Sequence, residues 1–198
     1  LGEELVLAPE LRDKLDTASS AQAALVRALV DWERAGVPRP VTRAELLALL
    51  GREPSWASHP TRPMSDLDEA LEWAISPLPD SRSALLYAAD GGYAAEDYIV
   101  ALLNVRGDVP PDTWRLVAQL VTPAEALAVG FSAYTRNQYE AALDAWTRAS
   151  AAEPPIPAKA LLNRAIALGR LQRPQEELEA YEEVVRGYGD APEIALRE

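Results

Sequence analysis

The stretch FSAYTRNQYEAALDAWTRASAAEPP, residues 131–155, decides the fold of the C-terminal part of this chain. Apolar residues recur at helical spacing on both sides of Asn137, which predicts two amphipathic helices joined by a tight turn. Asn137 can end the first helix in a left-handed conformation, and Pro154 stops the second because proline lacks a backbone N–H. We therefore expect a helical hairpin here.

Small and large residues follow one another in this hairpin at fixed spacing. Ala142 comes twelve residues after Gly130, Trp146 four residues after Ala142, and Pro154 eight after Trp146. Small residues let two antiparallel helices approach closely, and Trp146 fills the space between hairpins. This pattern resembles the tetratricopeptide repeat, a helical hairpin of about 34 residues.

The same register continues downstream. Ala165 lies thirty-five residues after Gly130, and three further residues occupy family positions: Leu161, Leu168 and Tyr181. A third copy begins at APEIALRE and stops at Glu198, although a short capping helix is the alternative there. We expect residues 122–198 to form two tetratricopeptide-like repeats and the start of a third, within a longer array.

Residues 1–121 are expected to form a mostly helical module with one small β-hairpin. Helices are predicted over residues 20–35, 43–50, 65–75, 96–103 and 112–120. Four helix starts, one of them in the C-terminal part, carry a capping pattern: Ser19 with Gln22, Thr42 with Glu45, Ser65 with Asp68, and Thr122 with Glu125. Asp90, Gly91 and Gly92 predict the hairpin turn, and the prolines of residues 52–63 predict a loop.

Three helices followed by a hairpin is the order of a winged helix. The alternative is a small helical domain with an incidental hairpin. In a winged helix the third helix would enter the major groove of DNA, but here it begins with Asp66 and Asp68, which repel phosphate. A winged-helix DNA-binding regulator is therefore the alternative function, and packing against protein is favoured.

Composition excludes several classes of chemistry. The net charge is −12, with 11 basic and 19 acidic residues in 1–121 and 8 and 12 in 122–198, so nucleic acid is not an expected partner. The chain has no cysteine, which excludes disulfides and thiolate chemistry. The segment LGEELVLAPE lacks the basic region and long apolar segment of a signal peptide, and no apolar run approaches about eighteen residues, so no membrane contact and a cytoplasmic location are expected.

A larger resemblance covers residues 20–120. Four of their segments are similar to the linking segment of actinobacterial signal-transduction ATPases with numerous domains. These segments are VDWERAGVPRPVTRAELLALL, LDEALEWAISPL, SALLYAADGGYAAEDYIV and VPPDTWRLV. The chain contains no Walker motif, so the resemblance implies that nucleotide chemistry belongs to a missing domain. Leu1 at the start and Met64 as the one methionine also suggest a segment of a longer protein.

Candidate catalytic and metal-binding residues have simpler explanations. His59, the sole histidine, lies in the proline-rich loop, where exposure to solvent is expected. The acids Asp66, Asp68, Glu69 and Glu72 occupy the first turns of a helix, where they favour its dipole. We assign no catalytic residue, cofactor or metal, and expect a non-enzymatic scaffold.

Binding is the stronger prediction. In tetratricopeptide proteins the first helices of successive hairpins line a concave groove, and the resemblance assigns eight residues to it: Leu127, Phe131, Tyr134, Lys159, Leu162, Asn163, Ile166 and Arg170. The family's carboxylate-clamp subtype has Lys and Asn where Leu127 and Phe131 stand, so recognition of a chaperone C-terminus is not expected. The alternative is that Phe131 and Tyr134 pack against the N-terminal module.

Overall fold

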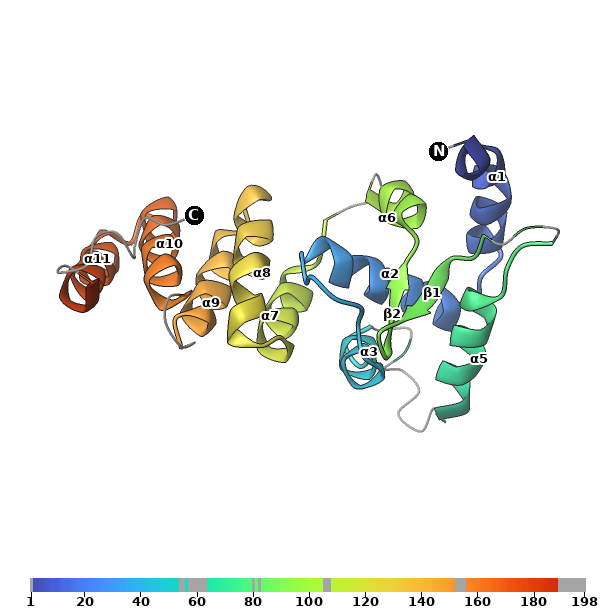
Figure 1. Cartoon of the computed structure of the whole chain (residues 1–198), viewed down its shortest axis with the longest axis horizontal. Coiled ribbons are helices and arrows are strands. Elements are labelled where there is room, and N and C mark those ends of the chain that lie inside the picture. The colour runs from blue at the N-terminus through green and yellow to red at the C-terminus, as the bar shows by residue number, and fades with distance from the viewer. Residues whose placement is uncertain are drawn as a thin grey trace. The chain divides into compact units, whose positions relative to one another are not determined.

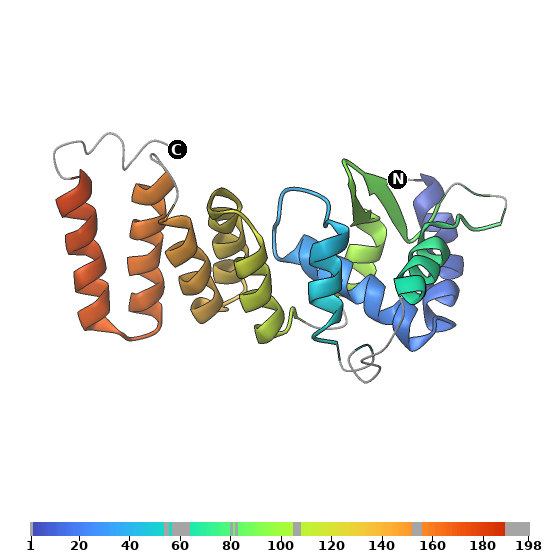
Figure 2. The ribbon, with the colours of Figure 1, turned by 90° about the horizontal axis from the view of Figure 1, so that it is seen from below.

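The computed structural model of the chain describes residues 2–53, 56, 64–79, 81, 83–104, 108–151 and 156–188. It is mostly helical, with one two-stranded antiparallel sheet (Figures 1 and 2). The chain divides into two compact units. Unit 1 contains residues 1–34 and 39–109, and unit 2 contains residues 35–38 and 110–198.

Unit 1 is built around one central helix. Its elements are α1 (Gly2–Asp16), α2 (Ser20–Arg34), α3 (Arg43–Leu50), α5 (Met64–Ile75), β1 (Leu86–Ala89), β2 (Gly92–Ala95) and α6 (Asp97–Asn104). Helix α2 packs against α3, α5, α6 and β2. Its core side chains Leu25, Leu29 and Trp32 are almost fully buried, so the apolar stripe predicted for this helix holds the unit together.

The β-hairpin has the tight turn that its sequence predicted. Asp90 and Gly91 take φ values of 48° and 76°, as a two-residue turn with left-handed backbone requires. Gly92 lies in β2 and not in the turn. A further strand-like contact, which the sequence did not predict, joins Val41 to the hairpin: Val41 and Tyr93 exchange two backbone hydrogen bonds of 2.9 Å. A Cβ atom at Gly92 would lie 2.6 Å from the Val41 carbonyl oxygen, so only glycine permits this approach.

The predicted helices of residues 20–120 are confirmed to within one residue at each end. The caps at Ser19, Thr42 and Thr122 are also confirmed, each with the reciprocal hydrogen bonds of a capping box. The Ser65 side chain and most of the 52–63 loop fall outside the described residues. Helix α1 was not predicted, because Pro9 inside it reads as a helix breaker.

Unit 2 is a series of antiparallel helices: α7 (Pro111–Leu120), α8 (Pro123–Thr135), α9 (Tyr139–Ala149), α10 (Ile156–Arg170) and α11 (Pro174–Tyr188). Neighbouring helices pack in chain order, and α8 also contacts α10. Helix α7, which we expected to close the N-terminal module of residues 1–121, is part of unit 2.

The turns of two hairpins repeat one geometry at a spacing of thirty-five residues. Asn137, between α8 and α9, has φ 59°, and Gln172, between α10 and α11, has φ 57°. The next residue in each turn donates its backbone N–H across the turn over 3.0 Å, from Gln138 to Ala133 and from Arg173 to Leu168. The left-handed turn predicted at Asn137 is therefore confirmed, and it has a counterpart one period later.

Candidate functional site

Helix α8 presents a row of three side chains, Leu127, Phe131 and Tyr134, whose spacing places them on one helix face. Phe131 is 40% exposed, although its ring packs edge-on against buried Trp146 with centroids 5.5 Å apart. The ring of Tyr134 lies 5.6 Å from the same indole. Two aromatic side chains of α8 thus pack against buried Trp146 of α9.

Helix α10 presents a second row at spacings of three and four residues: Lys159, Leu162, Asn163, Ile166 and Arg170. Lys159 and Arg170, at the two ends of the row, are exposed. Ile166 is 37% exposed, which leaves an apolar side chain between two cations.

The two rows meet through cation–π contacts. The Nζ atom of Lys159 lies 5.9 Å from the ring centroid of Phe131. The guanidinium carbon of Arg170 lies 6.0 Å from the ring centroid of Tyr134, and its Nε donates a 2.9 Å hydrogen bond to the tyrosine hydroxyl. Of the eight residues assigned from the sequence, the structure brings together Phe131 with Lys159 and Tyr134 with Arg170. The other four lie at helical spacing in the same two rows, which we call the α8–α10 surface.

Lys159 and Arg170 carry charge that no carboxylate neutralises in the described part of the chain. Two other cations of unit 2 are neutralised, because Arg164 pairs with Glu183 and Arg173 pairs with Glu176, whereas Arg136 and Arg148 donate to oxygen atoms of Ser132 and Val121. The hydrogen bond to Tyr134 raises the pKa of Arg170 above its ordinary value. Both cations are thus free to meet an anion from outside.

Asn163 is the unusual member of the surface. Its side chain is 9% exposed, and its Nδ2 atom has no hydrogen-bond partner. A buried donor without a partner costs about 1–3 kcal/mol. Most buried polar groups avoid this cost, and the Nδ2 atom is too deeply buried to meet a ligand in this conformation.

Sequence reasoning missed two supporting side chains on α9. The first is Trp146, which was expected only to fill the space between hairpins and not to support Phe131 and Tyr134. The second is Tyr139, whose ring lies 5.4 Å from that of Tyr134 and whose hydroxyl donates a 2.7 Å hydrogen bond to Asn137. The position of Tyr139 directly after the predicted turn was the available signal, since a residue there packs against the end of the preceding helix.

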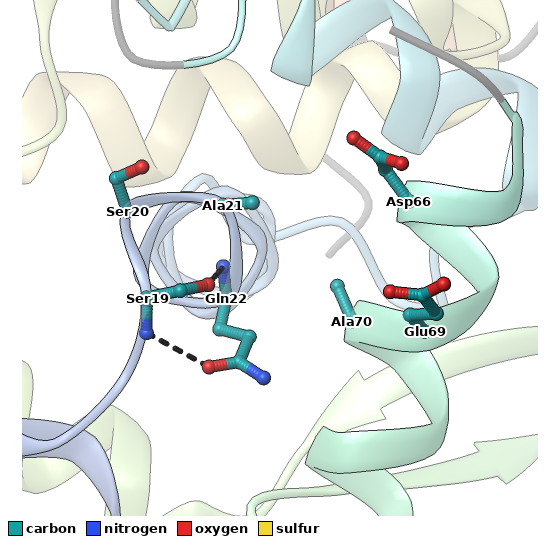
Figure 3. Close-up of a pocket in the computed structure, with 7 residues that line it drawn as sticks. All are labelled: Ser19, Ser20, Ala21, Gln22, Asp66, Glu69 and Ala70. Carbon is teal, nitrogen blue, oxygen red and sulfur yellow. Dashed lines mark hydrogen bonds between the residues drawn. The ribbon is translucent and has the colours of Figure 1, made fainter.

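Unit 1 contains a pocket between the start of α2 and the first turns of α5 (Figure 3). Seven residues line it: Ser19, Ser20, Ala21, Gln22, Asp66, Glu69 and Ala70. Ser19 and Gln22 are hydrogen-bonded to each other: the Ser19 backbone N–H donates to the Gln22 amide oxygen over 2.8 Å. The pocket is therefore lined by a helix cap and by two acids, half-buried Asp66 and exposed Glu69.

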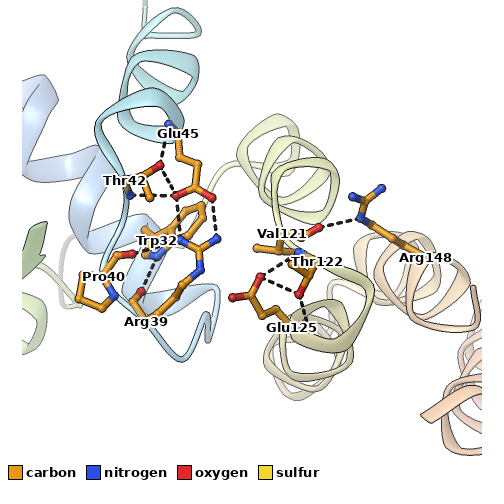
Figure 4. A network of polar contacts seen from close by, with 9 residues as sticks. All are labelled: Trp32, Arg39, Pro40, Thr42, Glu45, Val121, Thr122, Glu125 and Arg148. Atoms are coloured by element: carbon orange, nitrogen blue, oxygen red, sulfur yellow. Dashed lines mark hydrogen bonds and ion pairs between the residues drawn. The ribbon is translucent and has the colours of Figure 1, made fainter. Parts of the chain in front are cut away.

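Two polar networks hold loops in place, one in each unit (Figure 4). In unit 1, the Trp32 indole donates to the Arg39 carbonyl oxygen over 2.9 Å, and the Arg39 guanidinium donates two hydrogen bonds to Glu45. Burial raises the pKa of Glu45, but hydrogen bonds from Arg39 and Thr42 outweigh it and leave that pKa below its usual range.

The second network in Figure 4 joins helices of unit 2. Arg148 on α9 donates a 2.8 Å hydrogen bond from Nε to the carbonyl oxygen of Val121. Val121 directly precedes the capping box of Thr122 and Glu125, which starts α8. Both networks fix backbone positions, since each bonds a backbone carbonyl oxygen and includes or adjoins a helix cap.

Three further observations bear on function. In the described residues, no three His, Asp or Glu side chains come close enough to hold a metal ion, and His59 lies outside those residues. Among the described helices, none combines the length and apolar composition needed to cross a bilayer. No family model, curated protein or solved structure matches the chain.

Proposed function

We propose that this chain is a non-enzymatic interaction module of a larger cytoplasmic regulatory protein, and that it binds a peptide or partner domain through the α8–α10 surface. One observation carries the proposal: exposed Phe131 lies against Lys159, exposed Ile166 lies about one turn before Arg170 on α10, and no carboxylate neutralises either cation in the described residues. Apolar anchors beside such cations are the composition of a binding surface.

The proposal includes a tetratricopeptide-like array in unit 2. The thirty-five-residue spacing of the Asn137 and Gln172 turns supports it, as does the close packing of Gly130 against Trp146. In such an array the first helix of each hairpin lines the concave face, and α8 and α10 are those helices. Phe131 and Ile166 would then be exposed for a ligand.

The experiment is a selection from a random peptide display library on the immobilised chain. We expect the selected peptides to lose binding when Phe131 and Arg170 are both replaced by serine, while the melting temperature changes by no more than a few degrees. The matched control replaces Val185 and Arg186, an exposed apolar residue and an exposed arginine of α11, and should retain binding. Peptides that bind the double variant at Phe131 and Arg170 as well as the wild type would overturn the assignment.

A winged-helix DNA-binding regulator is the second candidate. The contact of Val41 with Tyr93 favours it, because a short strand after the first helix pairs with the hairpin in such folds. The charge of α5 opposes it, since Asp68 already holds Arg43 in a 2.7 Å ion pair, which takes one cation away from phosphate. A mobility-shift assay with random duplex DNA at low salt decides, and the interaction proposal expects no shift.

A further inference from the structure

We infer that the outer face of α11 binds a cationic amphipathic helix of another protein. This face lies on a different helix from the α8–α10 surface, so the inference goes beyond the proposed function. Three observations carry it: an exposed apolar stripe on α11, carboxylates beside the stripe that form no ion pair in the described residues, and the kind of helix that α11 already packs against.

Helix α11 exposes apolar side chains along one face. Leu178, Tyr181 and Val185 follow one another at spacings of three and four residues, which places them on the same side of the helix. Their exposed fractions are 60%, 36% and 68%. Apolar residues at alternating spacings of three and four form the seam between two packed helices. The spacing therefore favours a helix as the ligand of this face.

The inner side of α11 shows which kind of helix it accepts. There α11 packs against α10, its neighbour in unit 2 (Figures 1 and 2). Helix α10 contains three basic residues, Lys159, Arg164 and Arg170, and no acidic residue. Its Arg164 forms an ion pair with Glu183 of α11. Apolar packing and glutamate–arginine pairing are thus already combined on one side of α11, and the outer face offers the same two features.

The exposed glutamates of α11 differ in their partners. Glu176 and Glu183 each pair with an arginine of unit 2. Glu179 and Glu182 are also exposed, and within the described residues neither forms an ion pair. Complementary charge across an interface selects the partner more than it adds affinity. A ligand that brings its own cations is therefore favoured beside these two carboxylates.

The position of these charges defines the ligand further. Glu182 lies between Leu178 and Val185, about one turn from each, so its carboxylate borders the stripe. Glu179 lies farther round the same side. Arg186, four residues after Glu182, is exposed on that side as well and offsets one of the two charges. The bound helix therefore needs lysine or arginine along an edge of its own apolar stripe, and Arg186 opposes it.

Charge also decides between this ligand and two other occupants. In an antiparallel pair of α11 helices from two copies of the chain, the two Glu182 side chains would meet near the centre of the seam. In a parallel pair, Glu177 would face Glu182 of the second copy. Residues 189–198 of the chain itself carry three acids and one arginine, so they also add negative charge. The net charge of −12, by contrast, attracts a cationic helix at long range.

The test uses a fluorescein-labelled peptide of three heptads, titrated with the full chain by fluorescence polarisation. It carries leucine at the first and fourth positions of each heptad, lysine at the fifth and seventh, and alanine elsewhere, so that it favours a helix. One control peptide has glutamate in place of lysine, and another has the leucines rearranged so that they form no stripe. We expect the dissociation constant to rise at least tenfold for each control. Equal binding of either control peptide contradicts the inference.

Apolar variants show whether the peptide binds at this face. Leu178→Ser combined with Val185→Ser should weaken binding at least tenfold and move the melting temperature by no more than a few degrees, since both side chains are exposed. The matched control is Phe131→Ser combined with Ile166→Ser, two exposed apolar residues of the α8–α10 surface, and its affinity should stay within twofold. If the two double variants bind alike, net charge alone holds the peptide and the inference is wrong.

Charge variants separate the glutamates beside the stripe from the others. Glu179→Gln with Glu182→Gln should weaken binding at least threefold at low salt, where exposed charges are least screened. Glu176→Gln with Glu183→Gln makes the same change in net charge on the same helix and should stay within twofold. Arg186→Glu should strengthen binding at least threefold. Equal loss in the two glutamine pairs, or weaker binding by Arg186→Glu, rules the assignment out.

The two surfaces can be tested independently. Peptides shorter than about 12–15 residues form little helix in water, so short display peptides report on the α8–α10 surface and not on α11. Conversely, Phe131→Ser with Arg170→Ser should leave binding of the three-heptad peptide within twofold. A tenfold loss in this variant would move the peptide to the α8–α10 surface and remove the inference.

The other occupants have their own signatures. We expect the full chain to sediment as a monomer, and a dimer that Leu178→Ser with Val185→Ser dissociates would assign the face to a second copy. We expect Ile194→Ser with Leu196→Ser to leave peptide affinity within twofold. At least tenfold tighter binding by that variant would show that residues 189–198 compete for the face. Either result replaces the cationic helix of another protein as the occupant.

Discussion

A side-chain carbon on Gly130 would overlap the indole nitrogen of Trp146 and lie 2.7 Å from Cε2. The backbone of α8 therefore rests directly on the indole ring of α9. Phe131 and Tyr134 pack against the same ring. The close approach of α8 and α9 therefore determines where these two aromatic side chains lie on the α8–α10 surface.

Replacing Gly130 by alanine should destabilise the chain. Alanine favours an isolated helix by about 1 kcal/mol over glycine, but the clash with Trp146 should reverse this and lower the free energy of unfolding by about 1–3 kcal/mol. Gly187 is the matched control, since an added carbon there meets nothing within 4 Å. Gly187→Ala should leave stability unchanged or raise it slightly in urea unfolding. Equal effects of the two substitutions would contradict the packing argument.

Replacing Gln172 by glycine should stabilise the chain. Gln172 has φ 57°, and a left-handed residue with a side chain costs roughly 1 kcal/mol or more. Glycine removes this cost, and we expect a gain of about 0.5–1 kcal/mol. Gln138→Gly is the control, because Gln138 has φ −86° and glycine there relieves no left-handed conformation, so it should give no such gain. The comparison fails if both variants move urea unfolding in the same direction.

The helices could be predicted from the sequence because their signals are local. The capping boxes at Thr42 and Thr122 involve residues only three apart, and the turn at Asn137 depends on one left-handed residue. Such interactions form within one or two helical turns, so the local pattern of residue types is enough to predict where a helix begins and ends. This is why the helices predicted within residues 20–120 differ by at most one residue at each end from those of the structure.

Contacts between distant residues left no local signal. The pairing of Val41 with Tyr93 joins positions fifty-two residues apart, and a single strand-like residue has no periodicity. The resemblance to the tetratricopeptide repeat assigned the row of candidate residues on α10, but it could not show that the Nδ2 atom of Asn163 has no partner. Whether an amide finds a partner depends on the side chains packed around it, which spacing does not describe.

Replacing Thr122 by alanine should weaken the start of α8. The Thr122 side chain accepts a hydrogen bond from the Glu125 backbone N–H, and the Glu125 side chain accepts one from the Thr122 backbone N–H. Loss of such a cap costs about 1 kcal/mol. Thr147→Ala is the control, because Thr147 lies exposed within α9, where alanine favours the helix by a few tenths of a kcal/mol. Thermal unfolding should show a lower melting temperature for Thr122→Ala alone, and a lower value for Thr147→Ala would contradict the cap argument.

The stability of unit 1 should depend on pH through Asp31. Burial raises the pKa of Asp31 from 3.8 to about 6, although Arg34 opposes the shift from 3.6 Å away. Between these pH values the folded state holds a proton that the unfolded state has lost. The free energy of unfolding should therefore fall as pH rises from about 4 to about 6, by at most about 3 kcal/mol at 1.36 kcal/mol per pH unit.

Substitution isolates this contribution from that of other acids. Asparagine cannot titrate, so Asp31→Asn should remove the fall between pH 4 and 6, measured by urea unfolding at half-unit steps of pH. Asp112→Asn is the matched control, because Asp112 also pairs with an arginine three residues later, Arg115, but is exposed. Its profile should parallel that of the unsubstituted chain. If Asp31→Asn also leaves the profile unchanged, burial does not control the titration of this carboxyl.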